Sequence, residues 1–237
     1  MRFVVLSDTH SKHYQLESVP DGDVLIHCGD YSLFGEFDET KRFLDWFSEQ
    51  KHMHKIVIPG NHEVAICPRK NIFYNKELGN EIITDTCEER ICTFNRINEL
   101  IKSYQNIHFL VDDSITIDNI KFYGTPWCGG EKSVMGHWGF YLNEEEIRKQ
   151  VFDRIPYDTD VLISHSPPYG ILDEYRKTHL GCRALMKRVQ QVKPVIHIFG
   201  HIHDAYGEIQ SDYTSFYNCS NMNKDNNLSN PIKVIDL

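Results

Sequence analysis

The chain has 237 residues, of which 41% are hydrophobic and 25% are charged, the balance of an ordinary globular protein. Its net charge of −9 argues against a large surface for duplex nucleic acid, because such a surface needs clustered Lys and Arg. A chain of this length can bury a sizeable core, and we expect a single domain over residues 1–237.

Three features bear on the compartment. No apolar run approaches the roughly 20 residues that cross a bilayer, so no contact with a membrane is expected. The apolar segment that follows Met1 is too short for a signal peptide. The seven cysteines are odd in number and form no Cys-x-x-Cys pair, which favours reduced thiols. We therefore expect a cytoplasmic protein; the oligomeric state is not readable from these features.

Three apolar runs early in the chain predict buried strands, and each stops at polar residues. The runs are Phe3–Leu6, Val24–Cys28 and Lys55–Ile58, and the residues that follow them are Asp8-Thr9-His10, Gly29-Asp30 and Gly60-Asn61-His62-Glu63. At an extended strand end, Asp8 and His10 would point to the same side and could grip one cation. Each polar group alone has an ordinary alternative as a helix cap or a turn.

Helices and hairpins connect these and later strands. Apolar spacing predicts helices over Phe37–Gln50 and across Phe94–Tyr104. Short strands follow at Ile107–Val111, Ser114–Ile117 and Ile120–Tyr123, the last two joined by a turn at Asp118-Asn119. This change from helix-linked to hairpin-linked strands predicts a mixed sheet.

The segment Gly124–Phe140 is rich in glycine and aromatic residues, which suits a loop over a pocket. Within it Trp127 is open to two interpretations, stacking on a substrate or packing, and packing is favoured. Asn143 followed by Glu144-Glu145-Glu146 predicts the start of a helix with a capping box.

The last third of the chain repeats the pattern of strands that stop at histidines. Val161–Ser164 predicts a strand ending at His165, and Val195–Phe199 a strand ending at Gly200-His201-Ile202-His203, with a helix over Thr178–Val192 between them. His197 falls inside the second strand and is expected to be a hydrogen-bonded core residue. A hairpin around Ser211-Asp212, an Asn-rich loop and a closing strand over Ile232–Ile235 complete the chain.

Five strand ends therefore carry polar side chains that would converge if the strands share a sheet edge. The donors are oxygen and nitrogen atoms, without cysteine. This set suits Mn²⁺, Fe, Zn²⁺ or Co²⁺ at a reactive site better than a structural zinc.

These blocks, D-x-H, G-D, G-N-H-[DE], a later H and G-H-x-H in that order, resemble the calcineurin-like metallophosphoesterase superfamily over nearly the whole chain. Gly124–Trp127, the run from Gly200 into Ala205-Tyr206-Gly207, and the ending Asn230–Leu237 resemble more closely its metallophosphoesterase-domain group. Some members of that group lack the first histidine of G-H-x-H, which this chain keeps as His201. The resemblance implies an α/β fold, an αββα sandwich of two mixed sheets flanked by helices, with a dinuclear metal site at the carboxyl ends of the strands.

The resemblance also implies a role for each site residue. One metal ion would be held by Asp8, His10 and His203, the other by Asn61, His165 and His201, with Asp30 bridging the two. His62 would stand beside the substrate and protonate the leaving oxygen, and Glu63 would orient its neighbours. Two divalent transition-metal ions, with Mn²⁺ favoured over Fe, Zn²⁺ or Co²⁺, would activate a bridging hydroxide for in-line attack.

The reaction implied is hydrolysis of a small phosphoester, with cyclic nucleotide or aryl phosphodiesters favoured. A phosphomonoesterase, a protein phosphatase or a nuclease of the same superfamily is the alternative. A non-enzymatic scaffold with this fold is disfavoured because His62 is intact. The pocket walls are expected to come from aromatic residues, which could equally be packing: Tyr14, Trp127, Trp138, Tyr169 and Tyr206.

Overall fold

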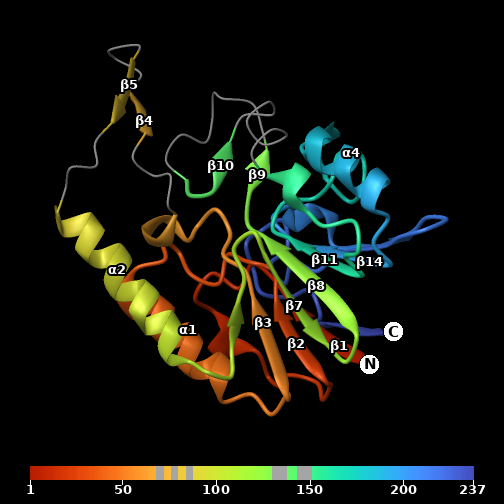
Figure 1. The fold of residues 1–237 in the computed structure, drawn as a ribbon, viewed down its shortest axis with the longest axis horizontal. Coiled ribbons are helices and arrows are strands. Elements are labelled where there is room, and N and C mark those ends of the chain that lie inside the picture. Colours follow the sequence, from red (N-terminus) through yellow and green to blue (C-terminus); the bar gives the residue numbers. More distant parts are fainter. Residues whose placement is uncertain (68–71, 76–79, 84–87, 130–137, 143–150) are drawn as a thin grey trace.

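Two large β-sheets pack face to face at the centre of the molecule (Figure 1). The computed structural model describes residues 1–67, 72–75, 80–83, 88–129, 138–142 and 151–237, and the account below concerns these residues. The first sheet has the order β17 (Lys233–Asp236), β1 (Arg2–Leu6), β2 (Val24–His27), β3 (His54–Val57) and β6 (His108–Phe109). Strands β1, β2, β3 and β6 are parallel, and β17 pairs antiparallel with β1.

The second sheet has six strands and two antiparallel edges. Its order is β15 (Gly207–Gln210), β16 (Ser215–Asn218), β14 (Ile196–Phe199), β11 (Val161–Ser164), β8 (Ile120–Thr125) and β7 (Asp113–Ile117). The four central strands are parallel, while β15 and β7 run antiparallel to their neighbours. Three small pairs lie outside the two sheets: β4 (Ile72–Asn75) with β5 (Asn80–Ile83), β9 (Cys128–Gly129) with β10 (Tyr141–Leu142), and β12 (Glu174–Tyr175) with β13 (Thr178–His179).

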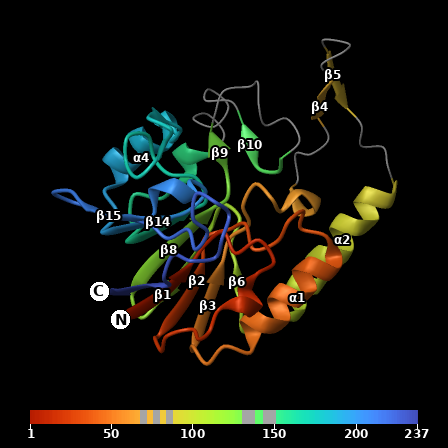
Figure 2. The same ribbon diagram turned by 180° about the vertical axis from the view of Figure 1, so that it is seen from behind.

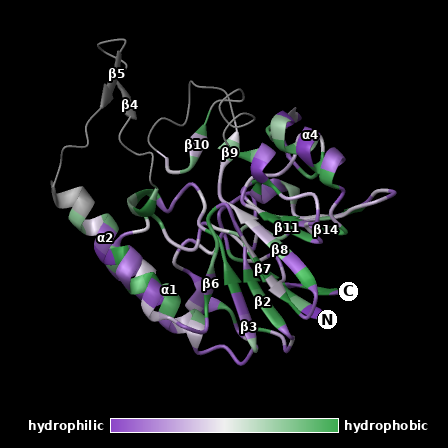
Figure 3. Cartoon of the chain, in the orientation of Figure 1, coloured by the Kyte–Doolittle hydropathy of each residue, from purple (hydrophilic) through white to green (hydrophobic). Residues whose placement is uncertain are grey.

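Apolar side chains fill the space between the sheets. Phe3 and Ile56 from the first sheet cluster with Phe122, Ile163 and Ile198 from the second, all of them buried. Strands β2 and β11 are buried along their whole length. A strand that is buried on both faces has a nearly continuous apolar sequence, which explains the apolar runs at these two strands. In Figure 3, strands of both sheets carry green segments, which mark their hydrophobic residues.

Helices cover the outer faces of both sheets. On the first sheet α1 (Phe37–Ser48) packs Phe43 and Phe47 against Leu25 and Val57. The helix α2 (Glu88–Ser103) runs beside α1, as Figure 2 shows from behind. On the second sheet α4 (Arg183–Val192) packs its apolar side against the strands (Leu185, Val189, Leu162 and Phe199). The layers are therefore helix, sheet, sheet and helix, and the expected αββα sandwich is confirmed.

Most expected elements are present with shifted ends. The turn at Asp118-Asn119 joins β7 to β8, and the hairpin around Ser211-Asp212 joins β15 to β16. The strand expected over Ile107–Val111 shrinks to β6. The helix expected at Asn143 lies outside the described residues, as does His137.

The helix predicted over Thr178–Val192 is wrong in its first turn. Thr178 and His179 form β13, and α4 begins only at Arg183, after Cys182, whose side chain accepts a hydrogen bond from Leu185 N. The reason is a buried carboxylate: Asp173 Oδ2 accepts hydrogen bonds from the backbone N–H groups of Gly170 and Gly181 and fixes a compact loop. None of the described helices is long and apolar enough to cross a membrane.

Candidate metal centre

Parallel pairing brings the polar strand ends to one edge. Leu6 of β1 pairs with His27 of β2, and His27 pairs with Val57 of β3, so the residues after these strands follow side by side. Two backbone hydrogen bonds then tie the first two loops together: Asp8 N donates to Gly29 O at 3.0 Å and His10 N donates to Asp30 O at 3.0 Å. The site is thus assembled by the register of the first sheet.

The backbone at these loops is strained. Asp8, His10, Asp30 and His201 all have positive φ, at 54°, 42°, 55° and 68°. The expectation that Asp8 and His10 lie on an extended strand end is therefore wrong, although both side chains contribute donor atoms to the same group. A left-handed non-glycine residue costs about 1 kcal/mol, and such residues gather at functional sites.

Glycine is required where the loops approach most closely. Gly29 has φ +98°, and a Cβ there would lie 2.7 Å from His165 Nδ1 and 2.8 Å from Gly60 N. No side chain fits at that spacing. This contact brings the loop after β2 in the first sheet against His165, the residue that follows β11 in the second.

The first group of donors is formed by Asp8, His10 and His203, whose donor atoms lie within 4.8 Å of one another. His203 Nε2 lies 3.7 Å from Asp8 Oδ1 and 3.4 Å from His10 Nε2. On its other side His203 Nδ1 lies 3.2 Å from Oδ1 of Asn226, so the Asn-rich loop orients this ring. His10 Nδ1 is buried without a hydrogen-bond partner among the described residues.

The second group joins the two sheets. His165 Nε2 lies 3.0 Å from Asn61 Oδ1, and the same histidine donates from Nδ1 to Cys28 O at 2.8 Å. The ring of His201 stands 5.0 Å from that of His165, between centroids. Asn61 and His165 are both buried, and the backbone hydrogen bond to Cys28 fixes which nitrogen faces the site.

Asp30 lies between the two groups. Its Oδ2 is 3.3 Å from His165 Nε2 and 3.9 Å from His10 Nε2. It also lies 4.0 Å from Nε2 of His62, and its Oδ1 accepts a hydrogen bond from His62 N at 2.8 Å. A carboxylate in this place can reach a cation in either group.

The donor set fits two cations. Ligands about 2.0–2.2 Å from a shared ion stand roughly 3–4 Å from one another, the range found here. His10 Nε2 and His203 Nε2 face each other at 3.4 Å, a contact that is favourable only when a proton or a cation lies between them. His10 Nδ1 has no hydrogen-bond partner among the described residues, so this nitrogen does not orient the ring.

Buried charges in this centre compensate one another. Burial opposes ionisation of Asp30, yet the charge and hydrogen bond of His165 outweigh burial and hold the pKa of Asp30 well below its usual value. Burial lowers the pKa of His165, but the charge and hydrogen bond of Asp30 outweigh burial and raise this pKa to about 9. Burial also opposes ionisation of Asp8, and the hydrogen bond and charge of His203 lower its pKa. In the metal-free chain the charge of His165 thus balances that of Asp30.

Glu63 supports the site without facing it. This fully buried carboxylate accepts four hydrogen bonds, from Asp30 N at 2.9 Å, Gly60 N at 2.6 Å, Ser32 N at 2.9 Å and Ser32 Oγ at 2.7 Å. Burial and then the charge of Asp30 raise the pKa of Glu63 to about 8, while the hydrogen bonds from Ser32 and Gly60 oppose that rise. Glu63 therefore holds together the two loops that carry Asp30 and Asn61.

His62 is the outermost histidine of the cluster. Its Nδ1 donates to Leu33 O at 3.0 Å, and its ring lies against that of Trp138 at 4.0 Å between centroids. The side chain is 21% exposed, whereas Asp30 is 3% exposed. Nε2 therefore faces both the centre and solvent, the position that a proton donor to a bound substrate needs. Its distance of 4.0 Å from Asp30 also satisfies the donor spacing of a ligand.

The aromatic residues expected to form pocket walls divide into two kinds. Trp138 contacts His62, whereas Trp127 is buried, donates from Nε1 to Asp112 and packs on Phe140. The favoured interpretation of Trp127 as packing agrees with this contact. Each of the three tyrosines contacts a basic residue: Tyr14 donates to Arg42 O, Tyr169 stacks with Arg183 and Tyr206 lies against Lys233.

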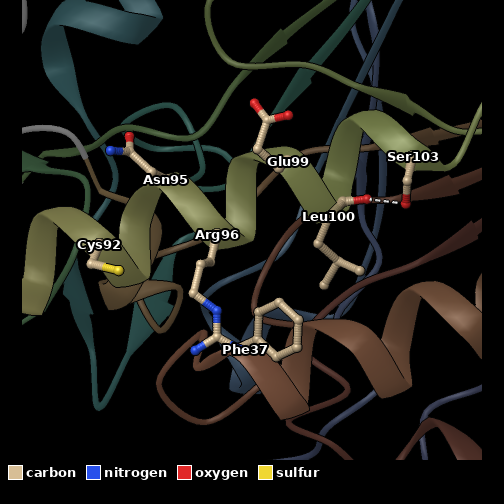
Figure 4. Close-up of a pocket in the computed structure, with 7 residues that line it drawn as sticks. All are labelled: Phe37, Cys92, Asn95, Arg96, Glu99, Leu100 and Ser103. Carbon is tan, nitrogen blue, oxygen red and sulfur yellow. Dashed lines mark hydrogen bonds between the residues drawn. The ribbon is translucent and has the colours of Figure 1, made fainter.

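Sequence reasoning missed Cys128, whose sulfur lies within 4.8 Å of donor atoms of His165 and His201. No sequence signal marks it: β8 pairs parallel with β11, with Thr125 opposite Ser164, and only this long-range pairing brings the residues after β8 to the same edge as His165. A separate groove of about 660 Å³ lies between α1 and α2 (Figure 4), and none of its lining residues belongs to the candidate centre.

Comparison with known proteins gives the family. Residues 1–205 match the family model of calcineurin-like phosphoesterases. The human metallophosphoesterase domain-containing protein 1 is 34% identical over 247 residues, covering 100% of this chain and 71% of that protein. The UPF0046 protein K07C11.7 of Caenorhabditis elegans is 33% identical, covering 96% of this chain and 72% of that protein.

A solved structure supports the fold independently. The protein TT1561 of Thermus thermophilus superposes with a TM-score of 0.60 at 9% identity, covering 92% of this chain and 88% of that one. At such low identity the likeness shows the fold alone. The family match and the two relatives establish that this chain belongs to the calcineurin-like phosphoesterase family.

Proposed function

We propose that this protein is a phosphodiesterase that hydrolyses small cyclic nucleotide or aryl phosphodiesters with two divalent metal ions. The observation that carries the proposal is the position of Asp30 between two groups of donors, with His62 Nε2 beside it. Asp8, His10 and His203 would hold one ion, Asn61, His165 and His201 the other, and Asp30 would touch both. Mn²⁺ is the first ion to test, with Fe, Zn²⁺ and Co²⁺ as alternatives.

The protein residues set up the reaction around these ions. Two bound cations activate water and neutralise the phosphoryl oxygens. Asn61 supplies a neutral oxygen, which leaves the centre more positive towards an anionic substrate. Asp30 and Glu63 fix the loops, and His62 holds a proton at Nε2 for the leaving oxygen while its Nδ1 donates to Leu33 O.

The charges of the side chains at this centre favour a phosphodiester over a phosphomonoester as the substrate. The described contacts of the centre involve carboxylates, an amide, imidazoles and a thiol, with no Lys or Arg among them. A monoester dianion would add a second negative charge next to Asp8 and Asp30 without an arginine clamp to receive it. Monoester hydrolysis, including protein phosphatase activity, and nuclease activity are the alternatives.

We also propose a cytoplasmic location and a single domain over residues 1–237. None of the six described cysteines is in a disulfide, which supports a reducing compartment. Both large sheets share one central core, which supports a single folding unit.

The proposal is tested by a substrate panel measured with added Mn²⁺. The purified protein should hydrolyse bis-p-nitrophenyl phosphate and cyclic nucleotides faster than p-nitrophenyl phosphate. In Asp30→Asn, kcat should fall by about 100-fold or more while the circular dichroism spectrum stays unchanged, because the shared ligand loses its charge.

Asp204→Asn is the matched control, since Asp204 is exposed and follows His203 directly. It should keep wild-type activity. Faster monoester than diester hydrolysis would reject the diesterase, and full activity in Asp30→Asn would reject the bridging role.

A further inference from the structure

We infer that Cys128 is a thiolate ligand of the second metal position, the one formed by Asn61, His165 and His201. This ligand would make that position prefer Zn²⁺ or Co²⁺ over Mn²⁺ or Mg²⁺. The inference rests on the proposed function only in requiring an ion there, and it is independent of the substrate.

The geometry is that of a fifth donor, beside Asp30 and the three residues just named. Cys128 Sγ and a ring nitrogen each from His165 and His201 all lie within 4.8 Å of one another. Sγ is 4.0 Å from Asn61 Oδ1, which is itself 3.0 Å from His165 Nε2. In a five-coordinate site with bonds of about 2.0–2.3 Å, neighbouring donors stand roughly 3–4 Å apart, so a movement of less than about 1 Å would bring the sulfur into range.

The backbone holds Cys128 in this place. Its N–H donates to Phe140 O at 2.8 Å, and the residue is fully buried in β9, three positions after the β8 residue that pairs with Ser164. The position of the thiol is therefore set by the edge of the second sheet that also carries His165.

Among the described residues the thiol has no strong hydrogen bond that would compete with a metal. Its two acceptors are Asn61 Oδ1 at 4.0 Å and Pro126 O at 3.9 Å, both at the outer limit for sulfur. One of these acceptors is itself a candidate ligand. A cation placed among these donors would therefore replace the weak contacts of the sulfur by one direct bond to the metal.

The chemistry of the set selects the metal. Thiolate and imidazole donors favour Zn²⁺ and Co²⁺, whereas Mn²⁺ and Mg²⁺ prefer oxygen. On binding, the S–H bond breaks, the sulfur lone pair bonds to the cation and the proton leaves to water, with no change of oxidation state. The other group, Asp8, His10 and His203, contains no sulfur and keeps its tolerance for Mn²⁺.

The test uses spectroscopy of the whole protein. With Zn²⁺ bound at two equivalents, X-ray absorption should show a sulfur neighbour at about 2.3 Å. With Co²⁺, the wild type should show the near-ultraviolet charge-transfer band of a cobalt thiolate. Cys128→Ser should lose both signals and weaken Zn²⁺ binding at one of the two sites by about 10- to 100-fold, with Mn²⁺ binding little changed.

Cys219→Ser is the matched control. Like Cys128, Cys219 is buried and directs its thiol at the carbonyl two residues earlier, that of Tyr217 at 3.8 Å, but it belongs to no donor group among the described residues. It should keep both signals. Two zinc ions bound through nitrogen and oxygen alone, in an active wild-type protein, would overturn the inference and leave the proposed function standing. A protein that binds fewer than two ions at saturation would overturn both.

Discussion

At the scale of single residues, His62 differs from His165 in exposure: both donate from Nδ1 to a backbone carbonyl, but the His62 side chain is 21% exposed and that of His165 is 0% exposed. A backbone carbonyl, Leu33 O, accepts from Nδ1, so Nε2 is free to exchange a proton. His62→Ala should reduce kcat by about 10²–10⁴-fold for diesters with alkoxide leaving groups. For bis-p-nitrophenyl phosphate the loss should be much smaller, because nitrophenolate leaves without a proton. Steady-state kinetics on the two substrate classes measures the difference.

The control for this prediction is His54→Ala, at the opposite end of the same strand, β3. It should leave both rates unchanged. Equal losses on the two substrate classes in His62→Ala would reject the role of acid and point instead to a role in holding a metal ion.

The sequence alone could identify His62 and its neighbours as site residues but could not identify Cys128, and the reason is physical. The polar residues after β1, β2, β3, β11 and β14 are visible because an apolar run stops at each. Cys128 follows Thr125 through a loop, and the cysteine is as apolar as its surroundings, so no contrast marks it. Only the parallel pairing of β8 with β11, a long-range contact, brings its sulfur to the site.

At the scale of elements, two hairpin turns show how local sequence can agree or conflict with structure. Asp118 and Asn119 adopt φ of 47° and 65°, and Arg176 and Lys177 of the β12–β13 turn adopt nearly the same values, 48° and 65°. The first pair suits such a turn, because Asp and Asn tolerate left-handed backbone. The second pair gives no turn signal, which is one reason the sequence predicted a helix from Thr178.

The conflict in the second turn predicts a stabilising change. Arg176→Asn with Lys177→Gly should raise the free energy of unfolding by about 0.5–1 kcal/mol, since Asn-Gly is the favoured pair for this turn. Urea unfolding measures the shift. Lys187→Gly, in the right-handed helix α4, is the matched control and should lower stability by about 1 kcal/mol. A loss of stability in the turn variant would show that the positive φ values carry no strain.

At the scale of the whole molecule, the layered core keeps several histidines neutral. His197 lies in β14 with Nε2 2.8 Å from Ser164 Oγ, and burial lowers its pKa to about 3. This agrees with the expectation of a core histidine. His13 is packed among the rings of Tyr14, Phe43 and Trp46, and both of its nitrogens lack partners among the described residues.

Burial, followed by the charge of Arg42, lowers the pKa of His13 to about 4 from 6.5. The folded value lies below the unfolded one, so the contribution of His13 to stability is complete above pH 6.5. It is lost as pH falls from 6.5 towards 4, the range in which the unfolded chain binds the proton more readily than the folded one. This linkage lowers the free energy of unfolding by about 2 kcal/mol as pH falls from about 7.5 to about 5. In His13→Phe the metal-free protein should therefore lose less stability over that range, measured by urea unfolding at each pH.

His179→Gln provides a control of opposite sign. The hydrogen bond and charge of Asp173 raise the pKa of His179, so its contribution is complete below the unfolded pKa and is lost as pH rises through the folded one. Removing His179 should therefore lower the free energy of unfolding at pH 5 and leave its value at pH 9 unchanged. Removing His13 should raise the free energy of unfolding, and the gain should be largest at pH 5. If His13→Phe and the wild type gave parallel stability profiles across this range, the aromatic cage around His13 would not be what makes the metal-free fold sensitive to acid.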